Sequence, residues 1–132
     1  MDEPLLTFER FEPGRVIRST PECIDATLLA HWRTLYPQDQ WEPGTLPLGL
    51  ATVLLMRAYM RTLTPRPPGN MHARQQLRLH GAIGAGDEVV TAFECTGKAL
   101  RRDRRYVDLA VRGHTLSDRL VFDGRMSMIW AA

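Results

Sequence analysis

The stretch LPLGLATVLLMRAYMRTL, residues 46–63, decides the fold because it predicts one long helix that is apolar almost all round. Its only charged side chains are Arg57 and Arg61, which lie one turn apart near its end. A helix without a broad polar face has to be buried on most of its sides. Thr45 is placed to cap this helix, and Pro47 suits its first turn. The rest of the chain must therefore supply a layer that wraps residues 46–63.

Length and composition favour one folded domain, which we assign to residues 1–132. The chain has 132 residues, of which 44% are hydrophobic, and a formal net charge of +2. This composition predicts a folded chain, and so small a charge does not argue for a nucleic-acid partner. The N-terminus lacks the basic start of a signal peptide, and the longest uncharged run, residues 43–56, is too short to span a bilayer. We therefore expect a cytoplasmic protein with no membrane or nucleic-acid partner.

The cysteines give no sign of a metal or another cofactor. Cys23 and Cys95 form no CxxC pair, and no His and Cys residues have the spacing of a zinc site. Both cysteines lie in periodic segments, so we expect them to be small buried hydrophobic residues.

Two short segments precede the long helix. Residues 15–19 predict a strand, and a helix is expected from Thr20, with Pro21 in its first position, to the residue before Pro37. The expected apolar face of that helix repeats every three or four residues and consists of Ile24, Leu28, His31 and Leu35.

After residue 70 the apolar pattern changes to a period of two, which predicts strands. The candidate strands are residues 73–80, 89–95, 107–111 and 120–130. In the last of them, Asp123 and Gly124 predict a bulge or a tight turn in midstream. Helices followed by successive strands indicate an α+β fold with an antiparallel sheet. Such a sheet, curved round residues 46–63, would bury the long helix.

Four short motifs occur in a distinctive order along the chain. They are FEPG at residues 11–14, PLGL at 47–50, GAGDE at 84–88 and LVFDGRMSMIW at 120–130. Together they resemble the MaoC-like branch of the hotdog fold, that of the R-specific enoyl-CoA hydratases and dehydratases. The resemblance covers residues 11–130. It implies the hotdog fold, in which an antiparallel β-sheet wraps one long central α-helix.

The loop before the long helix is where this family carries its catalytic residues. The family signature is an Asp followed, after Asn-Pro, by a His, and the two act with a bound water on an acyl thioester. Residues 37–45 (PQDQWEPGT) hold Asp39 but neither the Asn nor the His, and the loop is shorter than the family's. The resemblance implies Asp39 as a catalytic group. Glu42 is the only other carboxylate near the helix start, and a pair of carboxylates can divide the proton-handling roles, so Asp39 and Glu42 are the catalytic candidates. The alternative is a solvated loop with two ordinary acids, and Trp41 between them is either a packing anchor or a substrate platform.

The first turn of the long helix is a second candidate. N–H groups there have no partner within the helix and can polarise a thioester carbonyl. The resemblance implies that the backbone of Gly49 and Leu50 does so. The alternative is that Gly49 is a glycine because another part of the chain packs closely on it.

A basic patch surrounds Asp103 and is the third candidate. It consists of Arg101, Arg102, Arg104 and Arg105. One interpretation is that these arginines dock the phosphates of coenzyme A, since guanidinium groups pair well with phosphate. The alternative is a solvated hairpin tip.

The resemblance implies a protein that handles acyl-CoA. It would be a hydro-lyase of the enoyl-CoA hydratase or 3-hydroxyacyl dehydratase type. Alternatively, it would be a non-catalytic acyl-CoA-binding subunit that pairs with itself or with a catalytic homologue. An acyl-CoA thioesterase is a third alternative. The coenzyme A thioester would be the substrate or ligand, with no further cofactor, and both main hypotheses imply a homodimer or a higher oligomer.

Overall fold

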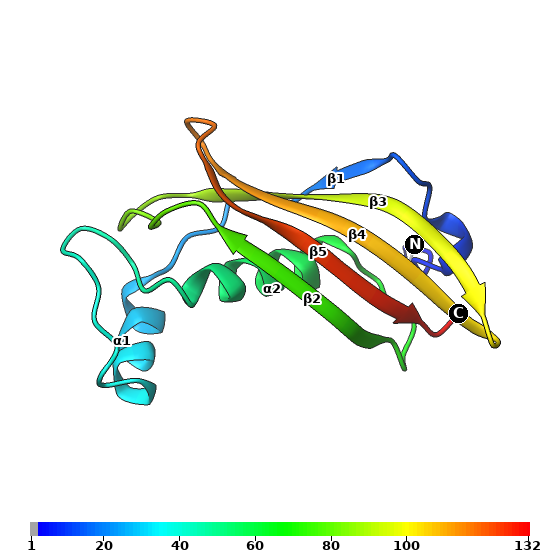
Figure 1. The fold of residues 1–132 in the computed structure, drawn as a ribbon, viewed down its shortest axis with the longest axis horizontal. Coiled ribbons are helices and arrows are strands. Elements are labelled where there is room, and N and C mark those ends of the chain that lie inside the picture. Colours follow the sequence, from blue (N-terminus) through cyan, green and yellow to red (C-terminus); the bar gives the residue numbers. More distant parts are fainter. Residues whose placement is uncertain (1–2) are drawn as a thin grey trace.

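The computed structural model describes residues 3–132 and contains a five-stranded antiparallel sheet in the order β1-β3-β4-β5-β2. The strands are β1 (Val16–Arg18), β2 (Met71–Leu79), β3 (Val89–Arg101), β4 (Arg104–Thr115) and β5 (Leu120–Trp130). The helices are the short 3-10 helix η1 (Phe8–Arg10), α1 (Ala26–Leu35) and α2 (Leu50–Thr62). Figure 1 shows the long strands curving across α2, so the expected α+β arrangement is confirmed.

The long helix α2 provides the centre of the core, as its apolar sequence predicts. It begins at Leu50 rather than at Leu46, because the residues before it form tight turns. In these turns, the Leu50 N–H donates to Pro47 O at 3.1 Å. The core joins α2 to the inner face of the sheet and includes Leu50, Leu54, Leu55, Ala58, Phe93, Leu109, Val111, Phe122, Met126 and Trp130.

The sheet does not cover α2 all round. One stripe of the helix remains open to solvent and forms an apolar hollow of about 370 Å³, lined by Thr52, Val53, Met56, Arg57, Met60 and Arg61. The side chain of Met60 is 53% exposed. No element of the described residues 3–132 packs on this apolar stripe, so the curved sheet does not account for its apolar character.

Helix α1 begins later than the sequence predicts. It starts at Ala26 with Asp25 as its N-cap, whereas the expected start was Thr20. The reason is that the segment before it joins the sheet. Glu22 N–H donates to Val89 O at 2.9 Å, and Val89 N–H donates back to Glu22 O at 2.8 Å. This pairing holds the chain in an extended conformation where the helix was expected.

The apolar face of α1 also differs from the prediction. His31 is exposed and Leu35 is 69% exposed, so they do not extend a buried stripe. Ile24 and Leu28 pack against the core as predicted, and Leu29 and Trp32 join them in place of His31 and Leu35. Figure 1 shows α1 beyond the end of the sheet, next to the start of α2.

Strand β5 runs straight through Asp123 and Gly124, so the predicted bulge or turn there is wrong. Gly124 pairs with Leu77 of β2 and with Val111 of β4. A Cβ on Gly124 would collide with the backbone O of Gln76. The glycine is therefore needed because β2 approaches β5 closely at this point.

Candidate functional site

The loop before α2 is fixed to the turn between β2 and β3. Leu46 N–H donates to Ile83 O at 2.9 Å, and Ala85 N–H donates to Gly44 O at 2.8 Å. Within the turn, the Asp87 carboxylate accepts a hydrogen bond from Gly84 N–H at 2.8 Å. The GAGDE motif thus forms the platform on which the loop rests.

Trp32 of α1 joins the two candidates that the sequence places on this loop and on α2. Its indole Nε1–H donates to Asp39 Oδ2 at 2.8 Å. A Cβ built on Gly49 would lie 2.7 Å from Cη2 and 2.8 Å from Cζ2 of the same ring. The structure therefore brings Asp39 and Gly49 to the same side of one indole, since Nε1 and Cζ2 are both bonded to Cε2 of the ring.

This contact explains why residue 49 is a glycine. Its φ of −61° and ψ of −21° are ordinary helical values that any residue adopts, so backbone conformation does not require glycine. The close approach of the Trp32 ring does require it, because a side chain would occupy the space of the ring. The expected close neighbour of Gly49 exists, and it is a tryptophan from α1.

Tight turns engage most donors in the first turn of α2. Leu50 N–H donates to Pro47 O and Ala51 N–H donates to Leu48 O, both at 3.1 Å. Within residues 3–132, the N–H groups of Leu48 and Gly49 make no hydrogen bond, so both are free to donate to a ligand carbonyl. The Trp32 ring lies on the Cα side of Gly49, where a side chain would otherwise be.

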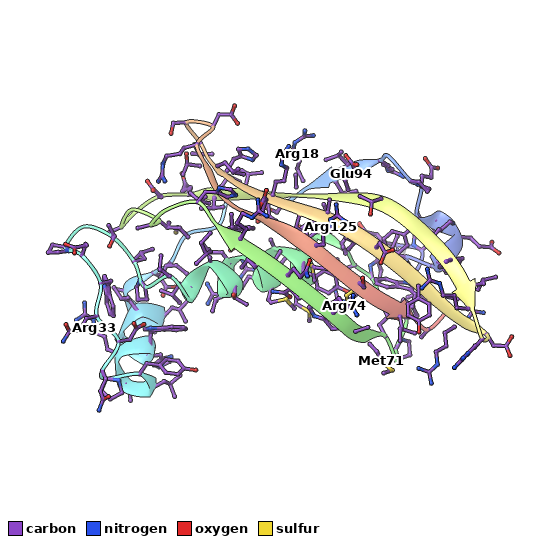
Figure 2. The ribbon with its side chains drawn as sticks, in the orientation of Figure 1. Arg18, Arg33, Met71, Arg74, Glu94 and Arg125 are labelled. Atoms are coloured by element: carbon purple, nitrogen blue, oxygen red, sulfur yellow. The ribbon has the colours of Figure 1, made fainter. Side chains whose placement is uncertain are left out.

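The other two loop candidates lie apart from this cluster. The Glu42 side chain is exposed, and in the part of the chain that the structure describes its carboxylate makes no hydrogen bond or ion pair. Only its backbone O is used, as acceptor from Thr45 Oγ1 at 2.6 Å. The ring of Trp41 lies 4.8 Å from the guanidinium of Arg33, a residue of α1 labelled in Figure 2. Trp41 thus acts in this structure as an anchor between the loop and α1.

The basic patch lies at the tip of the β3–β4 hairpin. Arg102 and Asp103 turn the chain with φ values of 49° and 64°. Arg101, Arg102, Arg104 and Tyr106 line an open hollow of about 580 Å³. Figure 1 places this hairpin tip at the opposite end of the sheet from α1. Within one chain, the patch and the loop before α2 are therefore separate.

Trp32 is the residue that the sequence analysis missed. The signal that could have found it is its position four residues after Leu28, on the stripe that packs against the core. A second missed contact lies at the other end of α2, where Arg61 Nη1 donates to both carboxylate oxygens of Glu22 at 2.6 and 2.7 Å. Glu22 is only 5% exposed, so this ion pair ties α2 to the sheet.

The two cysteines differ from each other. Cys95 is buried as predicted, and this burial raises the pKa of its thiol, which makes it a poor nucleophile. Cys23 is exposed, so the prediction that it is a buried hydrophobic residue is wrong. Across residues 3–132, no three His, Cys, Asp or Glu side chains gather to hold a metal ion. Among the same residues, no helix has both the length and the apolar character that crossing a membrane requires.

Comparisons with known proteins bear on the fold. No protein-family model matches the sequence, and no curated protein matches it either. A MaoC-like dehydratase from Rhodospirillum rubrum superposes with a TM-score of 0.80 at 15% identity, over 95% of this chain and 96% of that one. An unliganded R-hydratase from Pseudomonas aeruginosa gives 0.74 at 17% identity, over 96% and 86%.

A third solved structure contains the fold twice. It is a hypothetical protein from Mycobacterium tuberculosis with a double hotdog fold, matched with a TM-score of 0.74 at 19% identity. The match covers 97% of this chain and 45% of that one. The chain therefore has the hotdog fold, in a form similar to that of MaoC-like dehydratases and R-hydratases.

Proposed function

We propose that this protein is an acyl-CoA-binding hotdog subunit that works as a dimer and does not hydrate its ligand unaided. The observation that carries the proposal is the Trp32 ring, which lies on Gly49 and binds the Asp39 carboxylate. In hydration, one group must take a proton from water while a donor polarises the thioester. Here one indole packs on Gly49 and engages one carboxylate oxygen of Asp39, and the loop has no histidine.

The proposed dimer follows from the two surfaces that the fold leaves open. The nine-residue strand β2 is at the edge of the sheet, and an unpaired edge strand favours pairing with another chain. The uncovered stripe of α2, with Val53, Met56 and Met60, is apolar and would be covered by a second copy. The double hotdog fold of the M. tuberculosis protein supports the association of two such domains.

Dimerisation would also give the basic patch a role. A two-fold axis through paired β2 strands runs the two sheets in opposite directions. The hairpin tip of one copy then lies at the end of the dimer where α2 of the other copy begins. In this arrangement, Arg101, Arg102 and Arg104 would bind the coenzyme A phosphates of a ligand held beside the partner's α2.

An enoyl-CoA hydratase or dehydratase is the second candidate, and one observation favours it. Only Oδ2 of Asp39 is used by Trp32, and Oδ1 makes no hydrogen bond within residues 3–132, so it can accept a proton. The hydro-lyase would then use Asp39 as its base, with Glu42 as a second acid after the loop moves. A catalytic homologue that pairs with this chain could instead supply the missing histidine. Thioesterase activity is the third candidate, and no contact in the loop favours it.

Two measurements test the proposal. Purified protein is mixed with crotonyl-CoA and with a medium-chain enoyl-CoA, and the absorbance of the conjugated thioester is followed. The subunit hypothesis predicts binding without turnover. Turnover that disappears in Asp39→Asn, but persists in Glu12→Gln as a distant surface control, would establish the hydratase instead. Sedimentation should show a dimer at micromolar concentration that dissociates in Met56→Glu, and a strictly monomeric wild type would contradict the proposed assembly.

A further inference from the structure

The face of the sheet turned away from α2 carries a set of exposed arginines. They are Arg18 of β1, Arg74 and Arg78 of β2, Arg112 of β4 and Arg125 of β5. Figure 2 shows the labelled side chains of Arg18, Glu94, Arg125 and Arg74 spread across the sheet from β1 to β2. We call this surface the arginine face. Neither the fold nor the proposed function uses it.

Strand register places three of these arginines in one row. Arg18 lies opposite Ala92, Ala92 opposite Arg112, Arg112 opposite Asp123, and Asp123 opposite Arg78. Directly paired residues point to the same side of a sheet, and neighbouring strands are about 4.8 Å apart. The three arginines therefore recur on every second strand, at intervals of about 10 Å across the sheet.

A shallow groove runs between these side chains. It has a volume of about 1270 Å³, and the small residues Ala92, Ala110 and Gly124 are part of its lining. Arg18, Arg78, Arg112 and Arg125 all border it. Small residues between long side chains leave room for a partner to lie against the sheet while the guanidinium groups reach it from both sides.

The acids on this face do not neutralise the arginines. Asp123 Oδ1 is paired with His80 Nε2 at 3.1 Å, and Asp108 Oδ1 accepts from Ser127 Oγ at 2.8 Å. Within residues 3–132, none of the five arginines has a carboxylate within 4.0 Å. Five arginines against Glu94, Asp108, Asp118 and Asp123 leave a surplus of one positive charge on this face.

We propose that the arginine face docks an acidic α-helix of a partner protein that lies across the strands. Residues seven apart on a helix are separated by about 10.5 Å along its axis, which matches the interval between the arginines of the row. A guanidinium binds a carboxylate through two parallel hydrogen bonds, so each arginine can engage one acidic side chain.

The same surface is a poor site for nucleic acid. Single-stranded chains bind through aromatic side chains on which the bases stack, and among the described residues the groove is lined by His114 but by no Phe, Tyr or Trp. In addition, Glu94 and Asp123 lie among the arginines and would repel a continuous phosphate backbone. An amphipathic helix avoids both problems, because its uncharged positions can face these acids.

Fluorescence anisotropy tests the proposal with two fluorescein-labelled helical peptides of equal composition. One carries glutamates at positions i, i+7 and i+14, and the other carries the same three glutamates at consecutive positions. The spaced peptide should bind more tightly. Arg112→Gln and Arg18→Gln should each weaken its binding by about tenfold, the loss of one charge-assisted contact. Arg104→Gln, which removes an equal charge from the hairpin tip, should change binding less than twofold.

Three results would overturn the proposal. The first is equal binding of the two peptides, or no binding of either, since the spacing argument would then fail. The second is an equal loss in Arg104→Gln and Arg112→Gln, because the effect would then be one of net charge. The third is tighter binding of a 20-nucleotide single strand that Arg112→Gln also weakens, which would assign the face to nucleic acid. Circular dichroism of each variant checks that it is folded. We expect no loss of folding, because these arginines are exposed and make no ion pair in the described residues.

Discussion

Replacing Gly49 by alanine tests the contact on which the interpretation of the site depends. The new methyl group would lie 2.7 and 2.8 Å from two ring carbons of Trp32, closer than real carbon atoms approach one another. Alanine suits the helical φ and ψ of this position, so the ring has to move while the backbone stays. Movement of the ring would break its hydrogen bond to Asp39 and loosen α1 from α2.

The expected size of the effect follows from opposing contributions. Overpacking costs about 1–3 kcal/mol, and loss of an exposed hydrogen bond adds at most about 1 kcal/mol. Replacing glycine by alanine also stabilises the folded state by about 0.4–1 kcal/mol, because it lowers the conformational entropy of the unfolded chain. Because Trp32 is only partly buried and can shift, we expect a net loss of about 1–2 kcal/mol in the free energy of unfolding.

Urea unfolding followed by circular dichroism measures this loss, and tryptophan emission should move to longer wavelength as the indole becomes solvated. Gly97→Ala is the matched control, because a Cβ there meets nothing within 4 Å and the φ angle is not left-handed. Its stability should stay within about 0.5 kcal/mol of wild type. If Gly49→Ala unfolds at the same urea concentration as Gly97→Ala with unchanged emission, Trp32 does not pack on Gly49 and the reasoning fails.

Three further changes probe the frame that holds the site. Gly124→Ala forces its methyl group into the backbone of β2 and should lower the free energy of unfolding by about 3 kcal/mol in urea; a loss below about 1 kcal/mol would mean that β2 is not so close. Arg61→Ala leaves the buried Glu22 carboxylate unpaired and should lower the free energy of unfolding by about 1–2 kcal/mol. Arg57→Ala, which breaks no hydrogen bond or ion pair among residues 3–132, should lower it by less than about 0.5 kcal/mol. Equal losses in the two variants would contradict the ion pair. Burial raises the pKa of the Tyr59 phenol above its ordinary value of 10.0, so the neutral phenol stabilises the fold fully below pH 10.0 and this stabilisation is lost as pH rises through the folded-state pKa. The urea midpoints of wild type and Tyr59→Phe should therefore diverge above pH 10.0. Midpoints that stay parallel over that range would refute the burial of the phenol.

Local patterns were sufficient to predict the architecture. The apolar run at residues 46–63 predicted the central helix, and the period-two segments after residue 70 predicted the strands that wrap it. These two signals predicted the fold because a helix that is apolar all round and a strand with alternating apolar residues can each be recognised from residues close together in the sequence. The sequence did not predict that one stripe of α2 stays uncovered, because an apolar residue in the sequence does not indicate which element or which chain will cover it.

Long-range contacts account for what the sequence did not reveal. The start of α1 was displaced because Glu22 pairs with Val89, a residue far along the chain. Gly49 was marked as a point of close approach, but its neighbour Trp32 became known only when α1 was placed beside α2. The arginine face likewise depends on register, since Arg18 and Arg78 become members of one row only through the pairing of five strands.

The central claim is that the protein binds an acyl-CoA without converting it. Isothermal titration of crotonyl-CoA into the purified protein tests both parts at once, because binding gives heat that saturates and turnover gives heat that continues. We predict saturable heat with no continuing signal, and weaker binding in Arg102→Gln than in the control Arg15→Gln. Continuing heat would show that the chain is itself a hydratase, and the absence of any saturable heat would contradict acyl-CoA binding altogether.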